Sequence, residues 1–125
     1  MPFTASALSI SDDAELDLKN GPTFVGFIAV HKNVTETGAM ARTEEKLFYA
    51  GINYIKGFID AAVMIDDGYP VHLPFHLPQD ITIAQVIQAA DKYIKAHPDH
   101  RNAPTANLLF LSLEVAYPNP EYKKP

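Results

Sequence analysis

Apolar residues recur every three or four positions between Phe48 and Ala62, which is the spacing of one face of an α-helix. The stripe is wide enough to face several neighbouring elements, so we predict a central helix at about residues 43–65. Glu44 and Glu45 fall in its first turn, where the helix dipole favours acidic side chains. The stripe comprises Phe48, Ile52, Ile55 and Ile59, with Leu47, Tyr54, Phe58 and Ala62 on its flanks.

Two glycines, Gly51 and Gly57, interrupt this predicted helix. Each costs about 1 kcal/mol relative to alanine in a helix interior. Such glycines tend to have a packing reason, and the simplest is that another helix approaches the backbone closely. We therefore expect a packed helix at the centre of the fold.

Two further helical stripes follow in the C-terminal half of the chain. Thr82 and Gln85 have the spacing of a capping box and open the first of them, which should end before Pro98. Asn102 is a candidate cap for the last helix, and Pro118 ends it. The apolar positions are Ile83, Val86, Ile87, Ala90 and Ile94 in the first stripe, and Ala106, Leu109, Phe110, Leu113 and Tyr117 in the second.

The N-terminal third has weaker patterns. Residues 1–11 read as a loose arm, and a short helix over Ala14–Lys19 should stop at Asn20-Gly21-Pro22. Thr23–His31 suits a buried strand or a buried helix, and we favour helix because a lone strand would leave its backbone hydrogen bonds unmade. Asn33–Ala41 is polar and is expected to be a loop.

These elements predict an all-α fold: a small bundle of four to five helices forming one domain over residues 1–125, with a mobile tail at 119–125. Hydrophobic residues make up 47% and charged residues 20%, which is typical of a globular protein. The formal net charge of -5 disfavours nucleic acid as the partner and suits a basic surface.

The chain has no cysteine, which excludes disulfides, thiolate metal sites and cysteine nucleophiles. No apolar run reaches the length of a membrane span. The first residues lack the positive segment and apolar stretch of a signal peptide, although Ala5-Ser6-Ala7 resembles a cleavage pattern. Whether the N-terminus is native or trimmed stays open.

Residues 66–81 are irregular because Pro70, Pro74 and Pro78 occur at every fourth position and forbid a regular helix. Prolines lower the entropy that a loop loses on binding, which suits a recognition element. They equally suit a segment that only crosses from one helix to the next. If the segment binds a partner, the candidate contacts are Asp67, Tyr69, His72, Phe75 and His76.

Catalytic motifs are absent from the sequence, and neither a metal nor another cofactor is expected. His72 and His76 have a metal-like spacing, but Pro74 between them prevents the helix that would align both rings. Asp60 lies among apolar neighbours and is predicted to be a partly buried structural anchor. An enzyme would need Asp60 and a histidine to converge in a cleft.

Some polar and aromatic residues have ordinary structural interpretations. Ser112 should be satisfied by a carbonyl of the preceding helical turn. His97 and His100 flank Pro98, where a solvated or helix-capping histidine is expected. The aromatic residues Tyr49, Tyr54, Tyr69, Phe75 and Tyr93 suit either a core or an interface.

The chain resembles the Tai-type immunity proteins, which protect bacteria against amidase effectors of type VI secretion. The resemblance covers residues 47–118. It rests on the order and spacing of Gly51, Tyr54, Ile55, Gly57, Asp60, Leu77, Pro78, Thr82, Val86, Tyr93, Ile94, Ala96, His97, Pro98, Pro104, Ala106, Leu109, Leu113, Tyr117 and Pro118.

This resemblance implies an all-helical fold, frequent homodimerisation, no catalysis, and occlusion of the active-site groove of a peptidoglycan-cleaving effector. The family usually carries cysteines, and two of their places hold His76 and Asn119 here. The family resemblance implies the periplasm, whereas the missing cysteines and signal peptide leave the cytoplasm as an alternative. A helical adaptor or structural module that kept the scaffold is the alternative function.

Overall fold

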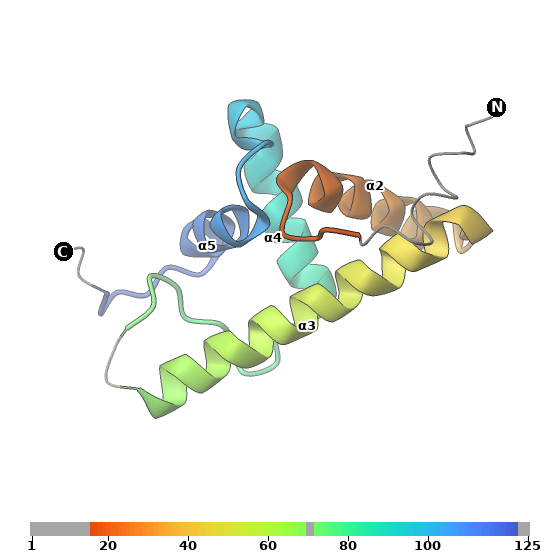
Figure 1. The fold of residues 1–125 in the computed structure, drawn as a ribbon. Helices are drawn as coiled ribbons and strands as arrows, with labels where there is room; N and C mark the ends of the chain where they lie inside the picture. Colours follow the sequence, from red (N-terminus) through yellow and green to blue (C-terminus); the bar gives the residue numbers. More distant parts are fainter. Residues whose placement is uncertain (1–15, 70–71, 123–125) are drawn as a thin grey trace.

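The computed structural model describes residues 16–69 and 72–122, and this part of the chain is all-α and forms no strand (Figure 1). The predicted fold class, a small bundle of four to five helices, is confirmed. Its four α-helices are α2 (Gly21–Thr37), α3 (Glu45–Gly68), α4 (Ile83–Ala96) and α5 (Thr105–Ala116). Single 3-10 turns, η1 (Arg42–Glu44) and η2 (Pro98–His100), precede α3 and α5.

Helix α3 is the longest element and runs along one side of the molecule, with α2 beside its first half (Figure 1). Helix α4 contacts α2, α3 and α5, and its contact with α5 is the most extensive. The core lies where the four helices meet. Its fully buried side chains include Phe24, Phe27, Ile55, Phe75, Val86, Leu108, Leu109 and Leu113.

The two glycines of α3 have different surroundings. A Cβ at Gly51 would overlap the ring of Phe27 from α2, so the predicted close approach is confirmed there. The approaching group is an aromatic ring and not a helix backbone. At Gly57 nothing lies within 4 Å of the Cβ position, so the same expectation is wrong for Gly57.

Helix α4 begins and ends as predicted. The Thr82 backbone N–H donates to Gln85 Oε1 at 2.9 Å, and the Gln85 backbone N–H donates to Thr82 Oγ1 at 3.1 Å. This capping box satisfies two amides that the helix itself leaves unpaired. The helix ends at Ala96, two residues before Pro98, because a proline disfavours helical geometry in the residue that precedes it.

Three expectations for the N-terminal third need correction. Asn20 starts a helix instead of following one, since its side chain accepts from the Thr23 backbone N–H at 3.3 Å. Leu16–Lys19 is a turn and not a helix, whereas residues 14–15 and the arm at 1–11 lie outside the described residues. The helix favoured for residues 23–31 is confirmed and extends to Thr37, so the predicted loop at 33–41 is wrong up to that residue.

Helix α5 ends before Pro118 as predicted, but it differs from its prediction at its N-terminal cap and in the face that it buries. Its cap position is Pro104 and not Asn102. Phe110 belongs to the predicted stripe but is exposed, whereas Leu108 and Ser112 are buried. The Ser112 hydroxyl donates to the Leu108 carbonyl, as expected for a serine inside a helix. The helix is apolar on most sides, so periodicity alone did not identify its core face.

The chain after α5 is tied to the segment that precedes α4. Phe75 and Pro118 form an isolated antiparallel bridge. The His76 backbone N–H donates to the Tyr117 carbonyl at 2.9 Å, and the Asn119 N–H donates to the Pro74 carbonyl at 3.1 Å. The prediction of a mobile tail is therefore wrong for Asn119, while residues 123–125 lie outside the described part of the chain.

Candidate functional site

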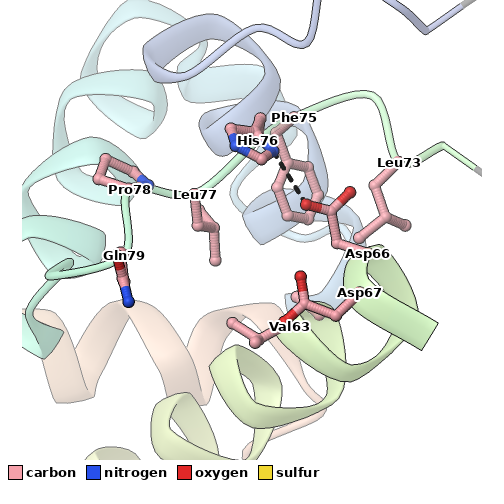
Figure 2. Close-up of a pocket in the computed structure, with 10 residues that line it drawn as sticks. Val63, Asp66, Asp67, Leu73, Phe75, His76, Leu77, Pro78 and Gln79 are labelled. Atoms are coloured by element: carbon pink, nitrogen blue, oxygen red, sulfur yellow. Dashed lines mark ion pairs between the residues drawn. The ribbon is translucent and has the colours of Figure 1, made fainter.

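A groove of about 310 Å³ lies between the C-terminal half of α3 and the irregular segment at residues 72–79 (Figure 2). Its volume is at the lower end of the roughly 300–1,000 Å³ range of small-molecule pockets. The groove therefore has room for one large side chain of a partner. It is lined by Ala62, Val63, Asp66, Asp67, Leu73, Phe75, His76, Leu77, Pro78 and Gln79.

Helical periodicity explains which residues of α3 line the groove. Ala62 and Asp66 are one turn apart, as are Val63 and Asp67, so two apolar and two acidic side chains share one face. Ala62 is buried, Asp66 is half-buried and Asp67 is exposed. The acidic pair therefore stands at the outer edge of an apolar wall.

The opposite wall is held in place by the core. Phe75 is only 1% exposed, and its ring packs against Phe58 of α3 and Phe110 of α5 at centroid distances of 6.3 Å and 5.3 Å. The Asn119 side-chain amide donates to the Leu73 carbonyl at 3.0 Å. Because the segment is anchored at Leu73 and Phe75, His76 and Leu77 project from a backbone that is held in place (Figure 2).

One ion pair crosses the groove. His76 Nδ1 lies 2.9 Å from Asp66 Oδ2, and the pair carries an ionic interaction when the imidazole is protonated (Figure 2). The His76 side chain is 64% exposed, so solvent screens this contact and its contribution to stability is small. Neither lysine nor arginine is among the lining residues, so the groove is negatively charged when His76 is neutral.

The predicted partner-binding residues fall into two groups. Asp67 and His76 line the groove and are exposed, and Tyr69 and His72 are exposed on the chain that connects its walls. Phe75 is also a predicted contact, but its ring is part of the core and is not available to a partner. The partner-binding role of these residues stays a prediction.

Sequence reasoning missed Asp66 and Leu73 as lining residues. A usable signal was present for Asp66, because its four-residue spacing from Ala62 places it on the inner side of α3. Leu73 carried no such signal. Its position depends on hydrogen bonds that join the segment to Asn119, which is 46 residues away along the chain.

Two of the predicted structural residues lie on α3 in different surroundings. Asp60 is exposed on α3, so its prediction as a partly buried anchor is wrong. Tyr54 is half-buried, and burial raises the pKa of its hydroxyl, with a smaller contribution from the negative charge of Asp17. Of the prolines, Pro98 opens η2 and Pro118 forms the bridge with Phe75.

The histidines near Pro98 form an aromatic cluster that the sequence did not reveal. The Tyr93 hydroxyl and His100 Nδ1 are 2.8 Å apart, and the His97 ring lies against Tyr93 at a centroid distance of 4.4 Å. His97 and His100 stack with ring planes 10° apart. The cluster fastens the η2 turn to the end of α4, so its first role is structural.

Neither a metal-binding cluster nor a membrane-spanning helix is found among the described residues. Among residues 16–69 and 72–122, no three histidine, cysteine, aspartate or glutamate side chains are grouped to hold a metal ion. In the same ranges, every helix is too short or too polar to cross a membrane. The groove remains the candidate site, with apolar walls and carboxylates at its edge.

Comparison with known families gives one match. The sequence model of the Rap1a immunity proteins matches residues 31–119, which is more than half of the chain and includes the whole groove. The resemblance noted above for residues 47–118 lies inside this range. No curated protein matches the sequence, and no solved structure matches it.

Proposed function

Because the chain belongs to the Rap1a immunity protein family, we propose that it is a non-catalytic immunity protein that binds and occludes a peptidoglycan-cleaving effector of type VI secretion. The family match carries this proposal, since immunity proteins act by binding a secreted effector. The resemblance to the Tai-type proteins supplies the narrower part, an amidase as the effector.

We propose that the groove and its surroundings contact the effector. Asp67, Tyr69, His72 and His76 are exposed there, and tyrosine is a common hot-spot residue at interfaces. The segment is anchored by Phe75, so little entropy is lost when it docks. A rigid projecting segment is suited to block the groove of an enzyme.

The experiment first examines the genes beside the gene of this protein for an effector-like amidase, and uses the product of such a gene. Both proteins are purified, their affinity is measured by calorimetry, and peptidoglycan hydrolysis is measured with and without the immunity protein. Tyr69→Ala should weaken binding at least tenfold. Tyr49→Ala is the matched control because both tyrosines are 56% exposed and lie at opposite ends of α3.

Tight binding with loss of hydrolysis supports the immunity role, and a selective effect of Tyr69→Ala supports the contact surface. The absence of binding contradicts the proposal. Binding that leaves hydrolysis unchanged would favour the alternative, a helical adaptor that kept the scaffold.

We also propose that the protein is a homodimer. Several apolar side chains on α3 and α5 are exposed, which is typical of surfaces that are covered by a partner. Light scattering after size exclusion would measure the mass, and Val115→Glu should shift a dimer to monomer if α5 forms the interface. The exposed apolar residues of α3 and α5 that we assign to this interface are Met64, Phe110, Leu111 and Val115.

The proposed compartment follows from the proposed target. Peptidoglycan lies in the periplasm, so an immunity protein against a peptidoglycan-cleaving effector acts there. Fractionation of the native host with an antibody against this chain would test the assignment. Recovery from the cytoplasm alone would contradict it.

A further inference from the structure

We propose that the groove between α3 and residues 72–79 takes up a single arginine side chain of the effector. The inference rests on the proposed function and adds the chemistry of the group that enters the groove. It has three supports: the apolar walls, the uncompensated charge at the edge, and the size of the space.

The walls suit the aliphatic part of an arginine. Val63 of α3 faces Leu77 across the groove, and Leu73 lies at its other end (Figure 2). An arginine stem packs well on such apolar surface while its charged end stays near water. A purely polar ligand would make no apolar contact with these walls. A purely apolar ligand would offer no hydrogen-bond donor to the carboxylates beside it.

The two carboxylates at the edge of the groove suit the guanidinium of an arginine. Asp66 is half-buried and has one oxygen 2.9 Å from His76, which leaves its other oxygen able to accept. The Asp67 carboxylate projects toward the same space, and no hydrogen bond or ion pair involves it within the described ranges (Figure 2). A guanidinium has five N–H donors in a fixed plane, so it can donate to both carboxylates at once.

The charge and the size of the groove favour arginine over other occupants. The lining residues contain two carboxylates and no lysine or arginine, and the whole chain has a net charge of -5, so an acidic group would be repelled. The volume of about 310 Å³ has room for one long side chain. Arginine is preferred over lysine because its weaker hydration lowers the cost of entering a half-enclosed site.

The first test uses arginine capped at both ends as the probe, with capped citrulline as the control. Citrulline has the same shape but a neutral urea in place of the guanidinium. Amide chemical shifts of the full chain are followed by NMR during each titration. Capped arginine should give saturable shifts confined to residues 62–79, and citrulline should not. Equal shifts from both probes, or none from arginine, would overturn the inference.

The second test uses the effector. The double variant Asp66→Asn and Asp67→Asn should lower the affinity about tenfold or more, since it removes charge-assisted hydrogen bonds. Glu45→Gln is the control because Glu45 is an exposed acid at the other end of α3. The loss should shrink as salt is added, because salt screens the charges.

The two proposals can fail separately. If the effector binds and is inhibited, but the double variant keeps full affinity, the arginine site is wrong while the immunity role stands. If capped arginine binds the groove but the effector does not bind the protein, the immunity role is wrong while the groove keeps its specificity for arginine.

Discussion

The ring of Phe27 on α2 fills the space beside Gly51 on α3 that the Cβ of any other residue would occupy. Phe27 is fully buried, so its ring has little freedom to move away. The pair brings α2 against the first half of α3. The absence of one methyl group at Gly51 is therefore what allows these two helices to pack as they do.

Gly51→Ala should lower the free energy of unfolding by about 1–3 kcal/mol, because the new methyl overlaps a buried ring. Gly57→Ala is the matched control on the same helix. It points into open space and should raise that free energy by about 0.5–1 kcal/mol, since alanine favours the helix more than glycine does. Urea unfolding measures both, and equal effects of the two substitutions would contradict the packing role of Gly51.

Phe75→Ala should lower the free energy of unfolding by about 3–5 kcal/mol, because the ring is buried between Phe58 and Phe110. Tyr69→Ala should change it by less than about 0.5 kcal/mol, since Tyr69 is exposed. Thermal or urea unfolding distinguishes the two. A neutral effect of Phe75→Ala would show that the segment is not held by the core. Partner-binding experiments should accordingly vary Tyr69 and leave Phe75 in place.

Thr82→Ala should lower the free energy of unfolding by about 1 kcal/mol, because it removes the hydroxyl that accepts from the Gln85 amide. Asn102→Ala should have no effect beyond about 0.5 kcal/mol, since Asn102 does not occupy the cap position of α5. Urea unfolding of both variants provides the comparison. A larger loss from Asn102→Ala than from Thr82→Ala would contradict the assigned caps.

Ionisation of the Tyr93 hydroxyl should lower the free energy of unfolding at alkaline pH. Burial raises the pKa of its hydroxyl above 10.0, and the negative charges of Asp99 and Glu114 add to the shift. The folded state therefore keeps the phenolic proton to higher pH than the unfolded state does. This contribution to stability is full below pH 10.0 and is lost as the pH rises through the folded pKa.

Urea unfolding at neutral pH and above the ordinary tyrosine pKa measures the effect. Tyr93→Phe should reduce the alkaline loss, although it also removes the hydrogen bond to His100 and costs about 0.5–1.5 kcal/mol at neutral pH. Part of the loss should persist in the variant because burial also raises the pKa of Tyr54. If the stability of the variant fell with rising pH as steeply as that of the wild type, Tyr93 would not be the cause of the alkaline loss of stability.

Local sequence patterns correctly predicted structural features that depend on only a few neighbouring residues. The capping box at Thr82 and Gln85 defined the start of α4, and Pro98 defined its end. The stripe through Ile55 identified α3 and the side on which it is buried. The same kind of signal misled at Asn20, because an Asn-Gly-Pro sequence suits the end of one helix as well as the start of another.

Features that depend on contacts between residues far apart in the sequence could not be predicted from local patterns. Asp60 is a different case, because the spacing along the helix already places it opposite Ile55 and Ala62, and it is exposed although its neighbours in sequence are apolar. Gly51 and Gly57 look alike along the chain, and only the position of Phe27 separates them. The Tyr93 and His100 contact required the η2 turn to fold back onto α4.

The sequence by itself determined that the chain is helical, where α4 runs, where α3 runs apart from its last turn, which extends to Gly68, and that the stretch around Pro74 and Pro78 is irregular. These properties follow from periodicity, capping and the missing N–H of proline, which act over a few residues. Only the tertiary structure decided that Phe75 is a core anchor and that Asp66 and Asp67 border a groove. Those roles depend on Phe110 and Asn119 returning to the segment from more than thirty residues away, and local patterns carry no record of such contacts.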